Sequence, residues 1–156
     1  MIDPDVKKRV DERYSRSLII YSSMAASALG IAAIGWIVIP AVQIPASAPA
    51  VVPIWVLVFF LAIAAIIARR SLVRWERLHD ITLLRGVDGL LATLQTNSII
   101  LAALGEMIII AGVVSAYLSF DRGDLLRSTI IAAVVFVLNF PRRSTWDTII
   151  SSLSKV

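Results

Sequence analysis

Cysteine is absent from the 156-residue chain, and histidine occurs only once. Without cysteine there is no disulfide, no thiolate nucleophile and no cysteine metal ligand. Only 17% of the residues are charged and 58% are hydrophobic, whereas a soluble domain carries about a quarter charged residues. The chain also lacks the H-E-x-x-H, G-x-S-x-G, P-loop and G-x-G-x-x-G patterns. The composition therefore indicates a membrane protein, and we expect neither enzymatic activity nor a bound cofactor.

Four apolar segments are candidates for crossing a bilayer, whose core of about 30 Å needs roughly 17–25 helical residues. They cover residues 18–39, 52–68, 98–120 and 125–140. The fourth segment is short, so we expect it to thin the bilayer, to let Arg127 snorkel or to lie among neighbouring helices. The predicted fold is all-α, an integral membrane four-helix protein that forms a single domain over residues 1–156.

Lysine and arginine are distributed unevenly along the chain. Thirteen of the 15 lie in the leader before the first segment (five), the linker over residues 69–97 (five) and the tail after the fourth segment (three). The other two are Arg122 and Arg127. Because cytoplasmic loops carry the excess of basic residues, both termini and the linker are predicted to face the cytoplasm from a bacterial plasma (inner) membrane. We read the basic excess as this topology signal, and a dedicated site for an anionic lipid or for nucleic acid is the alternative. The expected partner is the lipid bilayer and not nucleic acid.

The ends of the predicted helices carry their own signals. Asp3 as a cap and Pro4 at the first position predict that the leader is helical and continues into the first span. The proline-rich connector after the first span is expected to be stiff and non-helical. Asp124 is expected to cap the fourth helix after a turn at Gly123.

The linker and the tail both have apolar residues at helical spacing. We expect the second helix to continue past the membrane, turn near Gly86 and return. The apolar stripe of this hairpin would lie on the membrane surface or meet a partner. The tail over residues 144–154 is predicted to be an interfacial helix. Four side chains are expected to act as anchors at the membrane interface: Trp75, Trp146, Arg142 and Arg143.

Small residues recur at four-residue spacing in two of the spans. In membranes such rows let helix backbones approach closely. We expect them mainly to pack helices within the chain, with oligomerisation as the alternative. The rows are Ser22, Ala26 and Gly30 in the first span and Gly112 and Ala116 in the third.

Glu106 is the only charged residue inside the third span. A charged side chain at the centre of a bilayer costs roughly 2.5–3.5 kcal/mol on insertion scales. At about 1.5 Å per residue, Glu106 lies about 12 Å from the cytoplasmic end of its span, at the depth of Ser27 in the first span. We therefore predict a neutral carboxyl that points into the bundle and forms a hydrogen bond with Ser27 or to a backbone carbonyl.

The stretch "ALGEMIIIAGVVSAYLS" over residues 103–119 is similar to the carboxylate-bearing helix of rotary ATPase proteolipids, the c-type rotor subunits. This resemblance implies a proton-binding role for Glu106. The proteolipid carboxylate lies on the second helix of a hairpin, whereas Glu106 lies on the first helix of the second hairpin. The chain also resembles small uncharacterised four-span bacterial membrane proteins, a family that implies no activity. The resemblance rests on Gln95–Thr96, the motif Ala103-Leu104-Gly105-Glu106, the short fourth span and the closing Pro-Arg.

Three functions are compatible with these patterns. The first is a non-catalytic accessory or scaffolding subunit of a larger membrane complex, with other membrane subunits as partners. The second is a proton-linked carrier or rotor-type component that uses Glu106. The third is a pigment- or haem-binding subunit in which His79 is the axial ligand of a chlorin or haem metal. Because His79 is the only histidine, a surface or interface role is the simpler interpretation of it, and no other metal site is expected.

Overall fold

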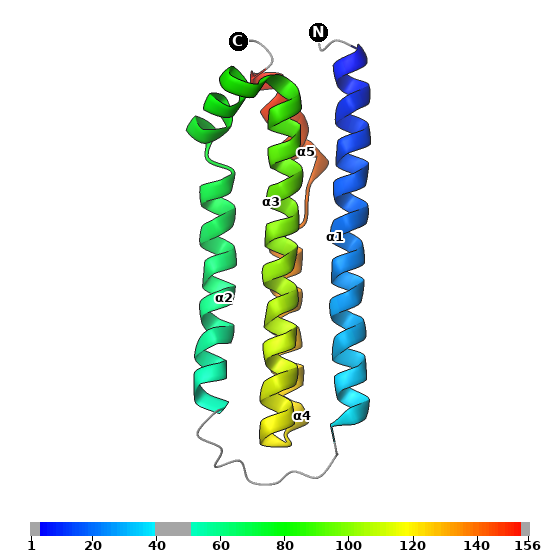
Figure 1. Cartoon of the computed structure of the whole chain (residues 1–156), viewed down its shortest axis with the longest axis vertical. Helices are drawn as coiled ribbons and strands as arrows, with labels where there is room; N and C mark the ends of the chain where they lie inside the picture. Colours follow the sequence, from blue (N-terminus) through cyan, green and yellow to red (C-terminus); the bar gives the residue numbers. More distant parts are fainter. Residues whose placement is uncertain (1–3, 40–50, 154–156) are drawn as a thin grey trace.

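The computed structural model describes residues 4–39 and 51–153, and every regular element within them is a helix (Figure 1). Four helices are long and apolar enough to cross a membrane, which confirms the all-α fold with four long apolar segments. The first helix begins at Pro4, as predicted, whereas Asp3 and the connector over residues 40–50 lie outside the described residues. The helices are α1 (Pro4–Val38), α2 (Val51–Leu72), α3 (Trp75–Ser119), α4 (Arg122–Asn139) and α5 (Arg143–Leu153).

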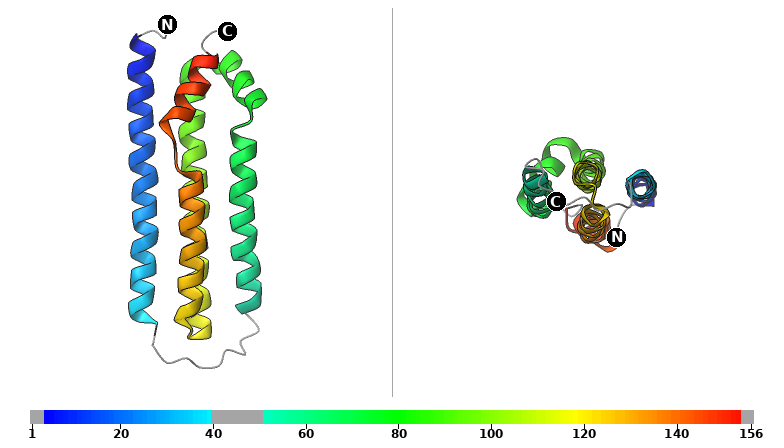
Figure 2. Two further views of the ribbon diagram at one scale, coloured as in Figure 1. Left: turned by 180° about the vertical axis from the view of Figure 1, so that it is seen from behind. Right: turned by 90° about the horizontal axis from the view of Figure 1, so that it is seen from below.

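Helix α3 lies at the centre of the bundle and packs against each of the other helices. Helices α1 and α2 flank the α3–α4 pair on opposite sides (Figure 2). The start of α1 and the whole of α5 lie at the same end of the bundle (Figure 1). We call this end the terminal end. The chain thus forms an elongated bundle in which α3 holds the two flanking helices together.

Helices α1 and α3 run parallel, and their pairing keeps one register along its length. Arg9 Nη1 donates to Asp88 Oδ2 at 3.0 Å near the terminal end. Ser27 Oγ donates to Glu106 Oε1, also at 3.0 Å, about five turns further along α1. Both pairs are separated by 79 positions in the sequence. The contact between Ser27 and Glu106 is therefore set by the packing of two whole helices.

Small residues of α3 bring α4 close to it in the apolar part of the bundle. A Cβ at Gly105 would lie 2.9 Å from the ring of Phe136, and a Cβ at Gly112 would overlap the side chain of Ser128. Ala116 is fully buried in the same core. Gly112 and Ala116 therefore pack helices within the chain, as the spacing predicts.

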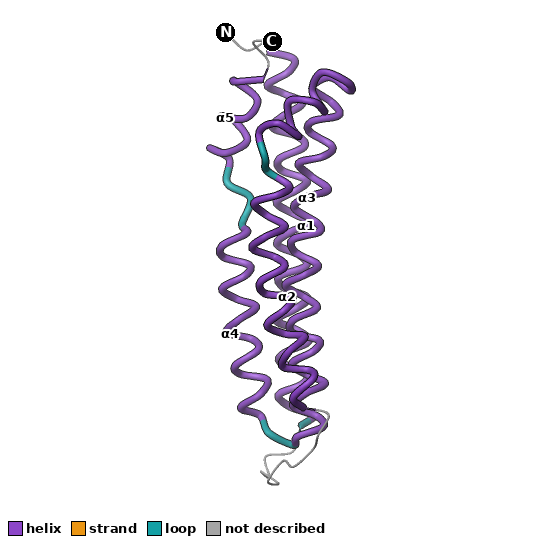
Figure 3. Tube along the Cα trace, turned by 90° about the vertical axis from the view of Figure 1, so that its left-hand side faces the viewer, coloured by secondary structure: helices purple, strands orange, loops and turns teal. Residues whose placement is uncertain are grey.

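A second apolar cluster closes the terminal end, where α5 continues beyond α4 along the side of the bundle (Figure 3). Trp146 and Ile150 of α5 are only 4% and 2% exposed, and they contact a patch of leucines on α3. The prediction of an interfacial helix is thus wrong for the apolar face of α5, which packs on protein, and Trp146 is not a membrane anchor. The leucines of that patch are Leu78, Leu90, Leu91 and Leu94.

The same cluster buries only part of the apolar stripe of the linker. Leu78, Leu91 and Leu94 are buried in it together with residues of α1 and α5, whereas Trp75 and Leu84 remain exposed. Helix α2 does not run on unbroken, because it ends at Leu72 before the new helix starts at Trp75. The predicted turn is confirmed: Gly86 kinks α3 with φ of 63° and ψ of −170°, a conformation that only glycine adopts readily. We call residues 75–85, which precede this kink, the hook.

The turn between α3 and α4 differs from the prediction in one residue. Asp121, not Asp124, caps α4, and its Oδ1 accepts from the Gly123 amide at 2.7 Å. Asp124 lies one turn later and points into the bundle instead. Arg122 donates from Nε to the Ile39 carbonyl at 2.9 Å, which ties the end of α1 to the start of α4.

Candidate functional site

The pair of Ser27 and Glu106 is the first candidate site. The predicted hydrogen bond is present, with Ser27 Oγ donating to Glu106 Oε1 at 3.0 Å. Ser27 is exposed and Glu106 is half-buried, so the pair lies at the rim of the α1–α3 interface and not inside the bundle. The inward-facing position predicted for Glu106 is therefore wrong. The reason is that their neighbours face the bundle: Gly105 before Glu106 and Ala28 after Ser27 are buried, and successive helical residues are about 100° apart.

An open apolar groove begins one turn beyond this pair. It has a volume of about 360 Å³ and is lined by Ile31 and Ile34 of α1 and by Val113 and Tyr117 of α3. Ile31 and Ile34 follow Ser27 by four and seven residues, and Val113 follows Glu106 by seven. These spacings place the groove and the polar pair on the same side of the two parallel helices. The Glu106 carboxyl thus lies near one end of an open apolar groove that runs along the bundle.

The small-residue row of α1 lies outside the bundle. Ser22, Ala26 and Gly30 are all exposed, and a Cβ built on Gly30 would meet nothing within 4 Å. The expectation that this row packs within the chain is therefore wrong. Helix α1 uses a different face for the bundle, centred on Ala28 and Gly35, which lies roughly 160° around the helix from the row.

Asp124 is a second carboxylate in the bundle, and sequence reasoning missed its role. It is only 5% exposed, and its Oδ2 accepts from Ser115 Oγ at 2.9 Å and from Ser119 Oγ at 3.1 Å. Arg127 Nη1 reaches Oδ1 at 3.3 Å. The signal was the pair of serines one turn apart at the end of α3, which face the first turn of α4 once the chain reverses. The serine contacts hold the end of α3 against the start of α4.

The remaining predicted site residues are not brought together. His79 lies half-buried on the hook, and no other histidine exists in the chain. Within residues 4–39 and 51–153, no three metal-ligating side chains form a cluster. Among the predicted anchors, Trp75 and Arg142 are exposed, whereas Arg143 forms ion pairs with Asp11 of α1 and Asp147 of α5.

Comparison with known proteins adds no further constraint on this site, since no protein family, no curated protein and no solved structure matches the chain.

Proposed function

We propose that this protein is a non-catalytic accessory subunit of a larger membrane complex, and that the outer side of α1 binds a transmembrane helix of another subunit. The observation that carries the proposal is the outward position of the small-residue row, Ser22, Ala26 and Gly30, beside the Ser27–Glu106 pair. The row, the pair and the apolar groove occupy adjoining sides of α1 and the neighbouring edge of α3, with Ala26 about 100° around the helix from Ser27. We call this surface the α1 face.

The physical argument rests on what each part of the α1 face offers a helix. Small side chains allow a second backbone to approach closely, and close packing is what drives helix association in lipid. Polar side chains are costly in contact with hydrocarbon, so they favour a partner that hydrogen-bonds them. In the described part of the chain, Glu106 Oε2 receives no hydrogen bond, so it remains able to pair with a donor from outside.

The basic residues support one orientation for this subunit. The leader arginines, the hook, and Arg142 and Arg143 at the start of α5 all belong to the terminal end, whereas Arg122 and Arg127 belong to the other (Figure 1). With the terminal end in the cytoplasm, this distribution follows the positive-inside bias. The proposal therefore places both termini and the hook on the cytoplasmic side of a plasma membrane.

Photo-crosslinking from single positions tests the proposal in native membranes. A photoreactive residue at Ala26 or Gly30 should give one discrete adduct whose peptide maps to a transmembrane helix of a different protein. The same residue at Ala133, an exposed alanine of α4, should give lipid adducts only. An adduct with a second copy of this chain would refute the hetero-complex, and lipid adducts at all three positions would refute the docking face.

A matched pair of substitutions tests the same face by measuring whether the complex assembles. Ala26→Leu adds bulk to the row, whereas Ala133→Leu adds the same bulk to an exposed site on α4. We expect Ala26→Leu to abolish co-purification of the crosslinked partner in mild detergent and Ala133→Leu to preserve it. Equal retention of the partner in both variants would contradict the proposal.

The half-exposed carboxyl favours a second candidate, a proton-linked component that uses Glu106. Glu106→Gln keeps the shape and the ability to accept from Ser27 but cannot exchange a proton. If the complex assembles normally and loses proton-coupled activity, the second candidate is supported. If the complex fails to assemble, or works unchanged, the accessory role stands.

A further inference from the structure

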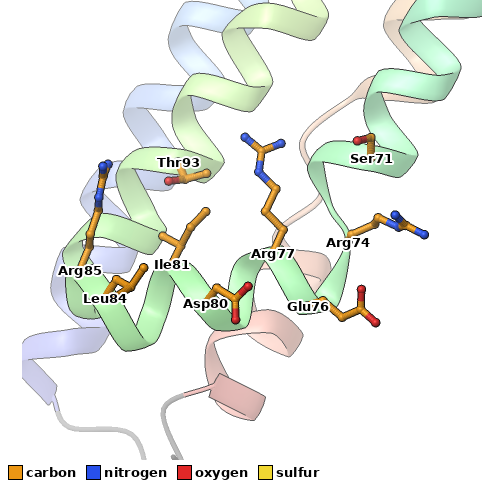
Figure 4. A pocket seen from close by; sticks show the side chains of 9 residues that line it. All are labelled: Ser71, Arg74, Glu76, Arg77, Asp80, Ile81, Leu84, Arg85 and Thr93. Atoms are coloured by element: carbon orange, nitrogen blue, oxygen red, sulfur yellow. The ribbon is translucent and has the colours of Figure 1, made fainter.

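The hook, the end of α2 and the return of α3 enclose a polar niche of about 660 Å³ (Figure 4). This volume is within the range of about 300–1,000 Å³ that small-molecule sites occupy. Arg77 extends from the hook into the space between Ser71 on α2 and Thr93 on α3, and Arg85 rises on the same side of the hook. The niche is separate from the α1 face, because α1 does not line it.

The charge of the niche comes from three arginines. Arg74, Arg77 and Arg85 line it, and in the described part of the chain no carboxylate lies within 4.0 Å of their guanidinium groups. Two carboxylates, Glu76 and Asp80, also line the niche, so its own excess is one positive charge. Arg69 and Arg70 in the last turn of α2 do not line the niche; they line a separate pocket against α4.

The depth of the niche matches the headgroup layer of a bilayer. Ser71 follows the apolar part of α2, which ends at Ala68, by three residues, and Thr93 precedes the apolar part of α3, which begins at Ser98, by five. At about 1.5 Å per residue these offsets are roughly 5 Å and 8 Å. The headgroup layer occupies about 5–8 Å on each side of the hydrocarbon core. The niche therefore opens where lipid phosphates lie if the four helices span the membrane.

We propose that this niche binds the phosphate of an anionic phospholipid. Guanidinium groups donate two parallel hydrogen bonds to a phosphate, and basic pockets beside transmembrane helices on the cytoplasmic side bind anionic headgroups. Ser71 Oγ supplies a further donor, whereas the Thr93 hydroxyl already donates to the Gly89 carbonyl at 2.9 Å. Leu84, which is 84% exposed at the mouth of the niche, contacts the glycerol and upper acyl chain.

Native mass spectrometry of the full chain, released from bilayers of equal phosphatidylglycerol and phosphatidylcholine, tests this site. We expect the wild type to retain phosphatidylglycerol at least tenfold over phosphatidylcholine. Arg77→Gln should remove most of this preference, a loss of at least tenfold. The control is Arg16→Gln, which removes one exposed positive charge from α1 outside the niche and should lower retention by about fivefold at most, the general effect of one basic residue near a membrane surface.

Two further measurements distinguish a lipid phosphate from a free phosphate, and a lost binding site from a failure to fold. Millimolar inorganic phosphate should leave the retained phosphatidylglycerol unchanged; displacement would show that the niche serves an anion from water and would overturn the proposal. If Arg77→Gln does not fold, as judged by circular dichroism, Arg85→Gln replaces it with the same expectation. Equal losses in the niche variant and in Arg16→Gln would also overturn the proposal, since they would indicate surface charge alone.

Discussion

Replacing Gly112 with alanine should destabilise the bundle, whereas the same replacement at Gly30 should not. A Cβ at Gly112 would overlap the hydroxyl and the Cβ of Ser128 on α4, but at Gly30 it would meet nothing within 4 Å. Both glycines lie in the interior of apolar helices, so the change in helix propensity is the same for both. The difference between the two variants therefore isolates the contact between α3 and α4.

The magnitude follows from three contributions. Overpacking of a tight core costs about 1–3 kcal/mol. If Ser128 rotates away to make room, it loses the hydrogen bond that its Oγ donates to the Leu125 carbonyl at 2.9 Å, which is about 1 kcal/mol. Alanine in place of glycine returns up to about 1 kcal/mol in a helix. We expect Gly112→Ala to lower the free energy of unfolding by about 1–3 kcal/mol and Gly30→Ala to raise it by up to about 1 kcal/mol.

Equilibrium unfolding in mixed micelles, followed by circular dichroism, measures both variants against the wild type. A second-site change provides a check on the mechanism: Ser128→Gly removes the atoms that the new Cβ would meet, so it should recover part of the loss in a Gly112→Ala background. Gly112→Ala as stable as Gly30→Ala would refute the close approach of α3 and α4.

Three further predictions concern the other packing features. Asp124→Ala should lose about 2–3 kcal/mol in unfolding titrations because it strands two buried serine hydroxyls, whereas Asp121→Ala removes a helix cap worth about 1 kcal/mol; equal losses would contradict the buried network. Trp146→Ala should lower the free energy of unfolding by about 3–5 kcal/mol, whereas Trp75→Ala should lower it by under about 1 kcal/mol because the Trp75 side chain is half exposed. Amide exchange at the terminal end measures both variants, and slow exchange in both would contradict a core position for Trp146. Gly86→Ala should lose about 1–3 kcal/mol because of its positive φ, and an unchanged unfolding midpoint would show that the kink does not require glycine.

The helices and the kink could be predicted from the sequence because each has a one-dimensional signal. Long uncharged runs define the spans, and Gly86 interrupts a helical pattern that continues on both sides of it. The hydrogen bond between Ser27 and Glu106 could also be predicted, because α1 and α3 run parallel from the same end. In that arrangement two residues at equal depth in their spans become neighbours.

The rotation of α1 could not be predicted, since lipid and protein neighbours are both apolar. Small residues occur on two sides of α1, with Ala28 and Gly35 facing the bundle and Ala26 and Gly30 facing outward. Hydrophobic periodicity cannot separate these two sides. The same ambiguity affected Trp146, because an amphipathic helix has one pattern whether it packs on a bilayer or on protein.

The carboxylates Asp124 and Glu106 differ in how many of their oxygens are hydrogen-bonded within the described residues. Asp124 accepts from two serines and pairs with Arg127, so both of its oxygens are occupied within the chain. Glu106 accepts from Ser27 through one oxygen, at the rim and not in the core, and the groove that begins beside it is lined by apolar side chains. A carboxyl used only for packing would resemble Asp124. Among the described residues nothing donates a hydrogen bond to the second oxygen of Glu106, and a partner helix or an exchangeable proton is what such an acceptor can use.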